Sequence, residues 1–385
     1  MTAPVYLDYN ATTPVAPEVV AAMQSFFERD FGNPSSPHAY GVRAHEALMV
    51  ARGRVARLIR ARPDEVLFTS GATEANNMAI QGIARALPGK RHLITSAIEH
   101  PSVLAPIMAM KAQGWNVTVL PVDHYGRVQV AEVMGAIRAD TALVSIMHAN
   151  NETGTLQPIR DIAAVAHASG VLMHTDAAQS AGKIPIDVNV LGVDLLTLAG
   201  HKFYAPKGVG ALYLAAGRTR PLPITFGAPQ ETGLRPGTEN VPAIVALGMA
   251  ALLADERIET SPAHLSRLRD RLHRLLTDQI PGLRINGHTD ERLPNTLNIS
   301  FPDIKAEALL AAVASDVAAS VGSACHGGDA GGSPTLKAMG SSGERMQGAI
   351  RFSVGLYLNE AQIDYAASAI VSAWRQLTGR PVEIR

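Results

Sequence analysis

Cysteine is almost absent from this sequence. Cys325 is the only one among 385 residues. A single thiol cannot form an intramolecular disulfide or a Cys-x-x-Cys metal site, and we predict no metal centre. Any special importance of Cys325 must therefore come from the chemistry of its own thiol.

The chain also lacks an excess of either charge. Lysine plus arginine and aspartate plus glutamate number 34 each, so no general polyanion-binding surface is expected and nucleic acid is not a predicted partner. No apolar run approaches the roughly 18 residues that cross a membrane. Residues 1–6 lack the charged and then apolar pattern of a signal peptide. We therefore expect a cytoplasmic protein without membrane association.

What the sequence does contain is a regular succession of short apolar runs between residues 60 and 215. Most are separated by segments of helical periodicity, which is typical of parallel strands joined by helices. This predicts an α/β fold with a doubly wound sheet, whose ligands bind at the carboxyl ends of the strands. The predicted strands are residues 66–69, 92–96, 117–122, 142–147, 171–175, 194–199 and 209–214.

The pattern changes after about residue 255, where a charged helical stretch, two predicted strands and a final helix follow. A chain of 385 residues exceeds the usual size of a single core, which agrees with a division into two domains. We place a large domain at 15–255 and a small domain at 1–14 together with 256–385. The final helix carries five apolar residues on one face, which predicts their burial: Ile363, Ala367, Ile370, Trp374 and Leu377.

Polar clusters follow most of the predicted strands. The first, residues 70–74, opens a helical segment, so backbone amides and the Thr73 hydroxyl are suited to hold a phosphate. Taken alone, this motif is equally well explained as an ordinary capped helix start. Further clusters end successive strands at residues 99–100, 150–152, 176–179 and 201–202. Since these strand ends share one edge of the sheet, we predict a common site there.

The clusters match the needs of one cofactor. A phosphorylated pyridine aldehyde needs a lysine for the aldehyde, a carboxylate at the ring nitrogen, a donor for the ring hydroxyl, an aromatic stacking partner and a phosphate cup. Singly, His100 is better explained as a core histidine and Asp176 as a helix cap. Together with Lys202 they predict a pyridoxal 5'-phosphate enzyme that holds its cofactor as a Schiff base on Lys202.

Ordered motifs extend along essentially the whole chain. They are Tyr6-Leu7-Asp8-Tyr9-Asn10-Ala11-Thr12-Thr13-Pro14, Ala149-Asn150-Asn151-Glu152-Thr153-Gly154, His174-Thr175-Asp176-Ala177-Ala178-Gln179, Gly200-His201-Lys202, Arg235-Pro236-Gly237-Thr238-Glu239-Asn240, Gly322-Ser323-Ala324-Cys325 and Arg351-Phe352-Ser353-Val354-Gly355. This set resembles the cysteine desulfurase and selenocysteine lyase family. The resemblance implies a fold-type I pyridoxal-phosphate transferase, with a large domain built on a mainly parallel seven-stranded sheet flanked by helices and a smaller α+β domain.

The resemblance also implies a role for each residue around the cofactor ring. Lys202 would form the covalent link and remove the α-proton, Asp176 would pair with the ring nitrogen, and His100 would stack on the ring. Asn151 and Gln179 would contact the ring hydroxyl.

Phosphate and substrate would be bound by residues from more distant parts of the chain. The resemblance assigns the phosphate to Ala72, Thr73 and His201, joined by Thr238 from the neighbouring subunit of a homodimer. Arg351 would bind the substrate carboxylate, since its fork of donors matches a carboxylate bidentately, and Asn33 would assist it.

Cys325 stands before a glycine-rich stretch, residues 326–333. This composition is unsuited to a core strand and is typical of a surface loop. A sulfur-accepting thiol must reach the substrate and then pass the sulfur on, and in the family this residue becomes the persulfide. Its thiolate needs a nearby base, for which His326, His100 and the released lysine amine are candidates.

The resulting prediction is a cysteine desulfurase. It would convert L-cysteine to L-alanine, keep the sulfur as a persulfide on Cys325, and deliver it to an acceptor or scaffold protein of iron–sulfur cluster assembly or thiolation. The spacing from Cys325 to Arg351 resembles that of the family's long-loop desulfurases, which usually deliver sulfur to a partner.

Two features favour a different member of the same family. Ala199 stands where many desulfurases have a phosphate-binding serine, and His326 and Gly327 replace the usual small hydroxyl residues after the cysteine. Both are similar to selenocysteine lyases, which release selenium from L-selenocysteine. A transaminase or epimerase, and a docking scaffold without catalysis, are further alternatives. The loop cysteine argues against the former, and the complete set of cofactor residues against the latter.

Overall fold

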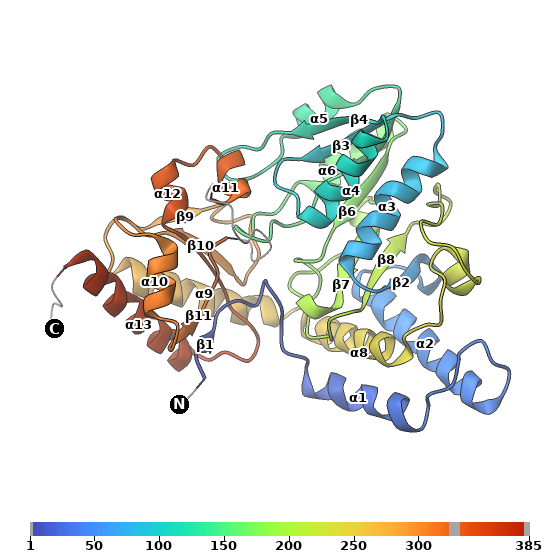
Figure 1. The fold of residues 1–385 in the computed structure, drawn as a ribbon, viewed down its shortest axis with the longest axis horizontal. Coiled ribbons are helices and arrows are strands. Elements are labelled where there is room, and N and C mark those ends of the chain that lie inside the picture. The colour runs from blue at the N-terminus through green and yellow to red at the C-terminus, as the bar shows by residue number, and fades with distance from the viewer. Residues whose placement is uncertain (1–2, 323–331, 381–385) are drawn as a thin grey trace.

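The computed structural model describes residues 3–322 and 332–380. Its central feature is a seven-stranded sheet (Figure 1). The strands are β2 (Val66–Thr69), β3 (His92–Ser96), β4 (Asn116–Leu120), β5 (Thr141–Ser145), β6 (Leu172–Asp176), β7 (Leu195–Ala199) and β8 (Gly210–Leu214). They lie in the order β2-β8-β7-β6-β5-β3-β4. Each predicted run coincides with one of them, and no bound differs by more than two residues.

Helices cover both faces of this sheet. They are α1 (Pro17–Glu28), α2 (Ala39–Leu58), α3 (Ala72–Ala86), α4 (Pro101–Ala112), α5 (Val130–Ala136), α6 (Ile159–Ala168), α7 (Val188–Leu191) and α8 (Val241–Arg257), with short 3₁₀ helices η1 (Pro63–Glu65), η2 (Gly200–Lys202) and η3 (Gln230–Gly233). Side chains alternate between the faces: Leu67 packs in one core with α3 and α4, whereas Val66 and Phe68 pack in another with α2, α6 and α8. The predicted arrangement, a mainly parallel sheet flanked by helices, is confirmed.

One strand runs against the predicted direction. β8 pairs antiparallel with both β7 and β2, and its register places Ala199 opposite Gly210. The segment between these residues holds only η2 and a turn, which is too short for a helical crossover, so the chain reverses and returns beside β7.

A second apolar core is built from the two ends of the chain. Its strands and helices are β1 (Val5–Tyr6), β9 (Arg284–Asn286), β10 (Thr296–Ser300), β11 (Val317–Ala318), β12 (Ala349–Ser353), α9 (Ser261–Thr277), α10 (Ala306–Ala312) and α13 (Glu360–Thr378). The short helices α11 (Pro334–Ala338) and α12 (Gly343–Gln347) pack in a separate small cluster with Ala349. Figure 1 shows β1 beside β11, with which it pairs in parallel, and β10 lies antiparallel between β9 and β12. The proposed domain boundaries remain predictions of the sequence.

The burial predicted for the final helix holds for four of its five residues. Ile363, Ala367, Ile370 and Trp374 are buried in this second core. The prediction was wrong for Leu377, which is 48% exposed. Leu377 lies in the last turn of α13, just before the left-handed Gly379 that ends the helix, and this turn extends past the core.

Within the residues that the structure describes, no helix is long and apolar enough to cross a membrane. The same residues contain no group of three or more histidine, cysteine, aspartate or glutamate side chains arranged to hold a metal ion.

Candidate active site

A cavity of about 340 Å³ lies at the carboxyl ends of the strands. Eight residues predicted for the cofactor line it together: Ala72, Thr73, His100, Asn151, Asp176, Gln179, His201 and Lys202. They come from α3, from the last residue of β6 and from the segments that follow β3, β5, β6 and β7. Parallel strand ends therefore converge here as the alternating pattern predicted.

The start of α3 forms one wall of this cavity. Its N-cap, Gly71, has a φ of 149°, a conformation that favours glycine. The amides of Ala72 and Thr73, in the first turn, have no partner inside the helix by the geometry of any helix start. With the helix dipole they make an anion site, to which the Thr73 hydroxyl adds a donor.

Asp176 is a buried carboxylate at the end of β6, 5% exposed. Its Oδ1 accepts a hydrogen bond from the amide of Ala178 at 2.9 Å, and its Oδ2 accepts one from Asn76 Nδ2 at 2.8 Å. Each carboxylate oxygen thus has one donor and still has room for another. The arrangement suits a carboxylate that pairs with a protonated ring nitrogen.

Lys202 ends η2, directly after β7. Its Nζ donates to the backbone carbonyls of Asn10 at 2.6 Å and Ala11 at 2.9 Å. The N-terminal segment thus contacts a lysine that lies 192 positions further along the chain than Asn10. The amine lies in the same cavity as Asp176, as required for one site to hold both ends of a pyridine aldehyde.

Asn10 and Lys183 were missed as site residues, although they organise it. Asn10 is 1% exposed, and its carbonyl accepts a hydrogen bond from Gln179 Nε2 at 3.0 Å. The buried Lys183 amine donates to Gln179 Oε1 at 3.0 Å and to Asn10 Oδ1 at 3.1 Å. Burial lowers the pKa of Lys183 well below its usual value, and the positive charges of Lys202 and Arg351 lower it further. Its spacing of one helical turn from Gln179 was the only signal in the sequence.

His201 lies beside this group, with Nδ1 3.2 Å from Thr12 Oγ1. Burial lowers the pKa of His201 to about 4, helped by the nearby charges of Lys202, Lys207 and Lys183. Its imidazole is therefore neutral at neutral pH, and it contributes hydrogen bonding rather than charge to the site.

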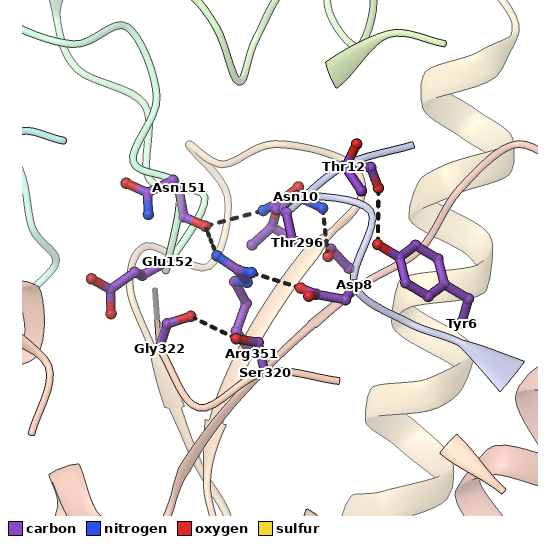
Figure 2. Close-up of polar contacts among 12 residues, drawn as sticks. Tyr6, Asp8, Asn10, Thr12, Asn151, Glu152, Thr296, Ser320, Gly322 and Arg351 are labelled. Atoms are coloured by element: carbon purple, nitrogen blue, oxygen red, sulfur yellow. Dashed lines mark hydrogen bonds and ion pairs between the residues drawn. The ribbon is translucent and has the colours of Figure 1, made fainter. Parts of the chain in front are cut away.

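Arg351 lies next to Asn151 and is only 2% exposed. Figure 2 shows its guanidinium between two partners: Nη1 donates to the carbonyl of Asn151 at 3.1 Å, and Nη2 donates to Asp8 Oδ1 at 2.6 Å. Its Nε has no hydrogen-bond partner among the described residues. A buried guanidinium with an unused donor is suited to bind a carboxylate. Asp8 was not predicted, and it supplies the charge that makes burial of Arg351 tolerable.

Glu152 contacts described residues both before and after the cysteine in the sequence: Gly322, Ser333 and Thr335. The carboxylate, 2% exposed, accepts hydrogen bonds from Ser333 Oγ at 2.5 Å and from Thr335 Oγ1 at 2.8 Å. Gly322 packs closely against the same carboxylate, because a Cβ added at this glycine would lie only 3.0 Å from Glu152 Oε2. Cys325 itself lies outside the described residues.

Three of the predicted residues that the structure describes do not line the cavity of this subunit: Arg351, Asn33 and Thr238. Asn33 is exposed, and its Oδ1 accepts a hydrogen bond from the amide of Ser35 at 2.9 Å. Thr238 is exposed on the segment after η3. A site on Thr238 requires the second subunit that the sequence predicted.

Glu99, next to His100, is a buried acid with a structural task. Its carboxyl group accepts hydrogen bonds from the amide of Met147 at 3.0 and 3.1 Å and from Ser96 Oγ at 2.5 Å. Burial raises the pKa of Glu99 to about 8, against these stabilising bonds and with a small contribution from the charge of Asp176.

This raised pKa predicts a pH-dependent stability. The folded chain holds a proton on Glu99 between an ordinary carboxyl pKa and about 8, where the unfolded chain has lost it, so stability falls as pH rises through this window. Glu99→Gln removes the titration. The free energy of unfolding of the Glu99→Gln variant, minus that of the wild type, is expected to increase by up to about 1.4 kcal/mol for each unit by which the pH rises. Urea unfolding across the window measures this, and a constant difference would contradict it.

Comparison with known proteins identifies the family. A family model described as aminotransferase class-V matches residues 5–366. A cysteine desulfurase of Trichormus azollae is 46% identical over 361 residues, which cover 94% of this chain and 90% of the relative. The chain belongs to the class-V aminotransferase family, among its cysteine desulfurases. The family resemblance inferred from the motifs is thereby confirmed.

Two solved structures agree with this assignment. A structure called a NifS-like protein superposes with a TM-score of 0.90 at 37% identity and covers 96% of this chain and 98% of its own. Another, described as SspA in complex with cysteine, has a TM-score of 0.82 at 36% identity and covers 93% of this chain and 100% of its own. The predicted fold-type I architecture is confirmed.

As a member of this family, the chain is a pyridoxal-phosphate enzyme, and its donor set fits that group. The residues present offer an amine, a doubly hydrogen-bonded carboxylate and a helix start with unused amides around one cavity. Lys202 would hold the aldehyde carbon, Asp176 the ring nitrogen, and the start of α3 the phosphate.

Proposed function

We propose that this chain takes sulfur from L-cysteine onto Cys325 as a persulfide and releases L-alanine. The observation that carries the proposal is the joint placement of Lys202, Asp176 and Arg351. The first two line one cavity, and the third is bonded to the carbonyl of Asn151, which lines the same cavity. Support comes also from the named cysteine desulfurase that is 46% identical to the chain.

The residues of the chain divide the work. Bound pyridoxal phosphate supplies an electron sink for electrons released at the substrate Cα. Asp176 holds a proton at the ring nitrogen, which keeps that sink effective. Arg351 binds the substrate carboxylate, and Lys202 Nζ takes the proton from Cα and later returns one. The Cys325 thiolate attacks the substrate sulfur, so that an S–S bond forms while the Cβ–S bond breaks. The substrate Cβ then gains a proton to give L-alanine.

The test of this proposal is product analysis with purified holoenzyme. L-Cysteine is expected to give alanine and, in the absence of a reductant, one persulfide per chain detected by mass on the peptide that contains Cys325. Alanine without persulfide would contradict the proposed sulfur acceptor. 3-Mercaptopyruvate or D-cysteine as the main product would instead indicate a transaminase or an epimerase.

A selenocysteine lyase is the second candidate, and one observation favours it. Ala199 lines the cavity at the end of β7, where it supplies no hydroxyl donor to an anion. Parallel assays with L-cysteine and L-selenocysteine distinguish the two. A turnover confined to L-selenocysteine would replace the desulfurase proposal.

A homodimer is part of the proposal, because Thr238 does not line the cavity of its own subunit and would complete that of a second subunit. It is supported by exposed apolar side chains near α1, α2 and the segment before η3, including Phe31 at 66% and Phe226 at 83% exposure. A second cavity of about 540 Å³, lined by α2 and η3, adjoins this surface and holds none of the predicted cofactor residues. Exposed apolar side chains that gather on one part of the surface are typical of an interface. A sedimentation mass of one chain would contradict a homodimer.

The destination of the sulfur completes the proposal. We propose a protein acceptor or scaffold of iron–sulfur cluster assembly or thiolation, in a cytoplasmic location. Its support is chemical: a persulfide is reactive toward thiols and must be handed on for the enzyme to turn over.

A further inference from the structure

A chain of hydrogen bonds joins Asp176, assigned to the ring nitrogen of the cofactor, to His100, assigned to stack on the ring. Asn76 Nδ2 donates to Asp176 Oδ2 at 2.8 Å and to Ser102 Oγ at 2.9 Å. Ser102 Oγ lies 2.8 Å from His100 Nδ1. The four residues come from α3, the start of α4 and the end of β6, and neither Asn76 nor Ser102 was singled out by the sequence.

The partners determine the direction of every bond. An ionised Asp176 only accepts, so Asn76 must turn its NH₂ group toward it. The second hydrogen of that group is donated to the Ser102 oxygen, which leaves the Ser102 hydroxyl hydrogen for His100 Nδ1. The backbone amide of Ser102 also donates to Nδ1, at 3.1 Å, because His100 is the N-cap of α4. Two donors at Nδ1 place the proton of a neutral His100 on Nε2.

This arrangement is not the one that best stabilises the fold. Asn76 is fully buried, and its Oδ1 has no hydrogen-bond partner among the described residues. A buried acceptor without a partner is a cost to stability. An apolar residue of similar shape would avoid this cost, so the amide at this position is better explained by its two donated bonds.

We propose that Asn76 and Ser102 are positioning residues that couple Asp176 to His100 and hold His100 as the Nε2–H tautomer. The inference rests on the proposed function in one respect, the contact of Asp176 and His100 with the cofactor ring. Its consequence is that His100 acts toward the site as a proton donor at Nε2. A His100 in this state cannot act as the base for Cys325, which leaves His326 and the released lysine amine as candidates.

The test uses full-length holoenzyme labelled with ¹⁵N-histidine, in which loss of a signal in His100→Gln assigns the two ring nitrogens. In the wild type, Nε2 is expected to carry the proton, and Nδ1 to show the shift of an unprotonated, hydrogen-bonded nitrogen. Ser102→Ala is expected to move the Nδ1 signal toward that of a nitrogen with one donor fewer. Asn76→Leu is expected to move it in the same direction by a smaller amount, because the Ser102 hydroxyl then lacks the donor that orients it. A proton on Nδ1 in the wild type, or an unmoved Nδ1 signal in Ser102→Ala, would overturn the proposal.

Kinetics supply the second readout. Each single variant is expected to lower kcat with L-cysteine by about 10-fold, the rate equivalent of one hydrogen bond. The double variant is expected to lose no more than the worse single variant, because both break one chain of bonds. Losses that multiply would show two independent structural effects and overturn the coupling.

A matched control exists in the same sheet. Ser145 Oγ lies 2.8 Å from Nδ1 of the buried His174, and neither residue lines the cavity. Ser145→Ala removes the same kind of contact and is expected to leave the His100 signals unchanged. If the wild type releases no alanine from L-cysteine, the proposed function fails, while the ring-nitrogen signals still decide the tautomer of His100.

Discussion

Replacing Lys202 with alanine is expected to remove the covalent link to the cofactor and to lower alanine release from L-cysteine by roughly 10³-fold or more, given that acid–base groups typically contribute 10² to 10⁴. The physical reason is that Lys202 Nζ has two tasks, holding the aldehyde carbon and moving the α-proton. Among the described residues, the cavity wall contains one other lysine, Lys207, and this lysine is exposed.

Borohydride reduction followed by peptide mass measures the covalent link. In the wild type, the added mass of the cofactor is expected on the peptide that contains Lys202. Lys207→Ala is the control, since it removes another amine from the same cavity and should retain the link at Lys202. Added mass on a different lysine, or a covalent link that survives in Lys202→Ala, would refute the assignment of the anchor.

The second large effect is expected from Cys325→Ala. This variant should keep the covalent cofactor but lose alanine release from L-cysteine by roughly 10³-fold or more, the scale seen when a catalytic nucleophile is removed. The reason is that the Cβ–S bond breaks as the thiolate takes the sulfur, so without a thiol the sulfur has no acceptor. Peptide mass should also show no persulfide.

The substrate distinguishes the two candidate functions in this variant. Full activity with L-cysteine would refute the persulfide mechanism. Loss of cysteine turnover together with retained selenocysteine turnover would show that Cys325 discriminates between sulfur and selenium. Absorbance of the bound cofactor is the control in both cases, because a variant that no longer binds it has lost more than a nucleophile.

Much of the cofactor site could be predicted because each residue follows a strand. Thr73, His100, Asp176 and Lys202 lie at strand ends that the alternating pattern places on one edge, and all four line the same cavity. Their partners could not be predicted in this way. Arg351 and Asp8 are 343 positions apart, and no local pattern indicates that an aspartate near one end of the chain will pair with an arginine near the other.

Local sequence was therefore sufficient for the strands, the α/β class and the chemistry of the cofactor residues, because each depends on a short window of side chains and on its position at a strand end. Folding in three dimensions decided the reversal of β8, the exposure of Leu377 and the use of Asn10, Asn76, Ser102 and Lys183. These depend on which distant side chain can reach a buried donor or acceptor, and that is settled only when the segments pack together.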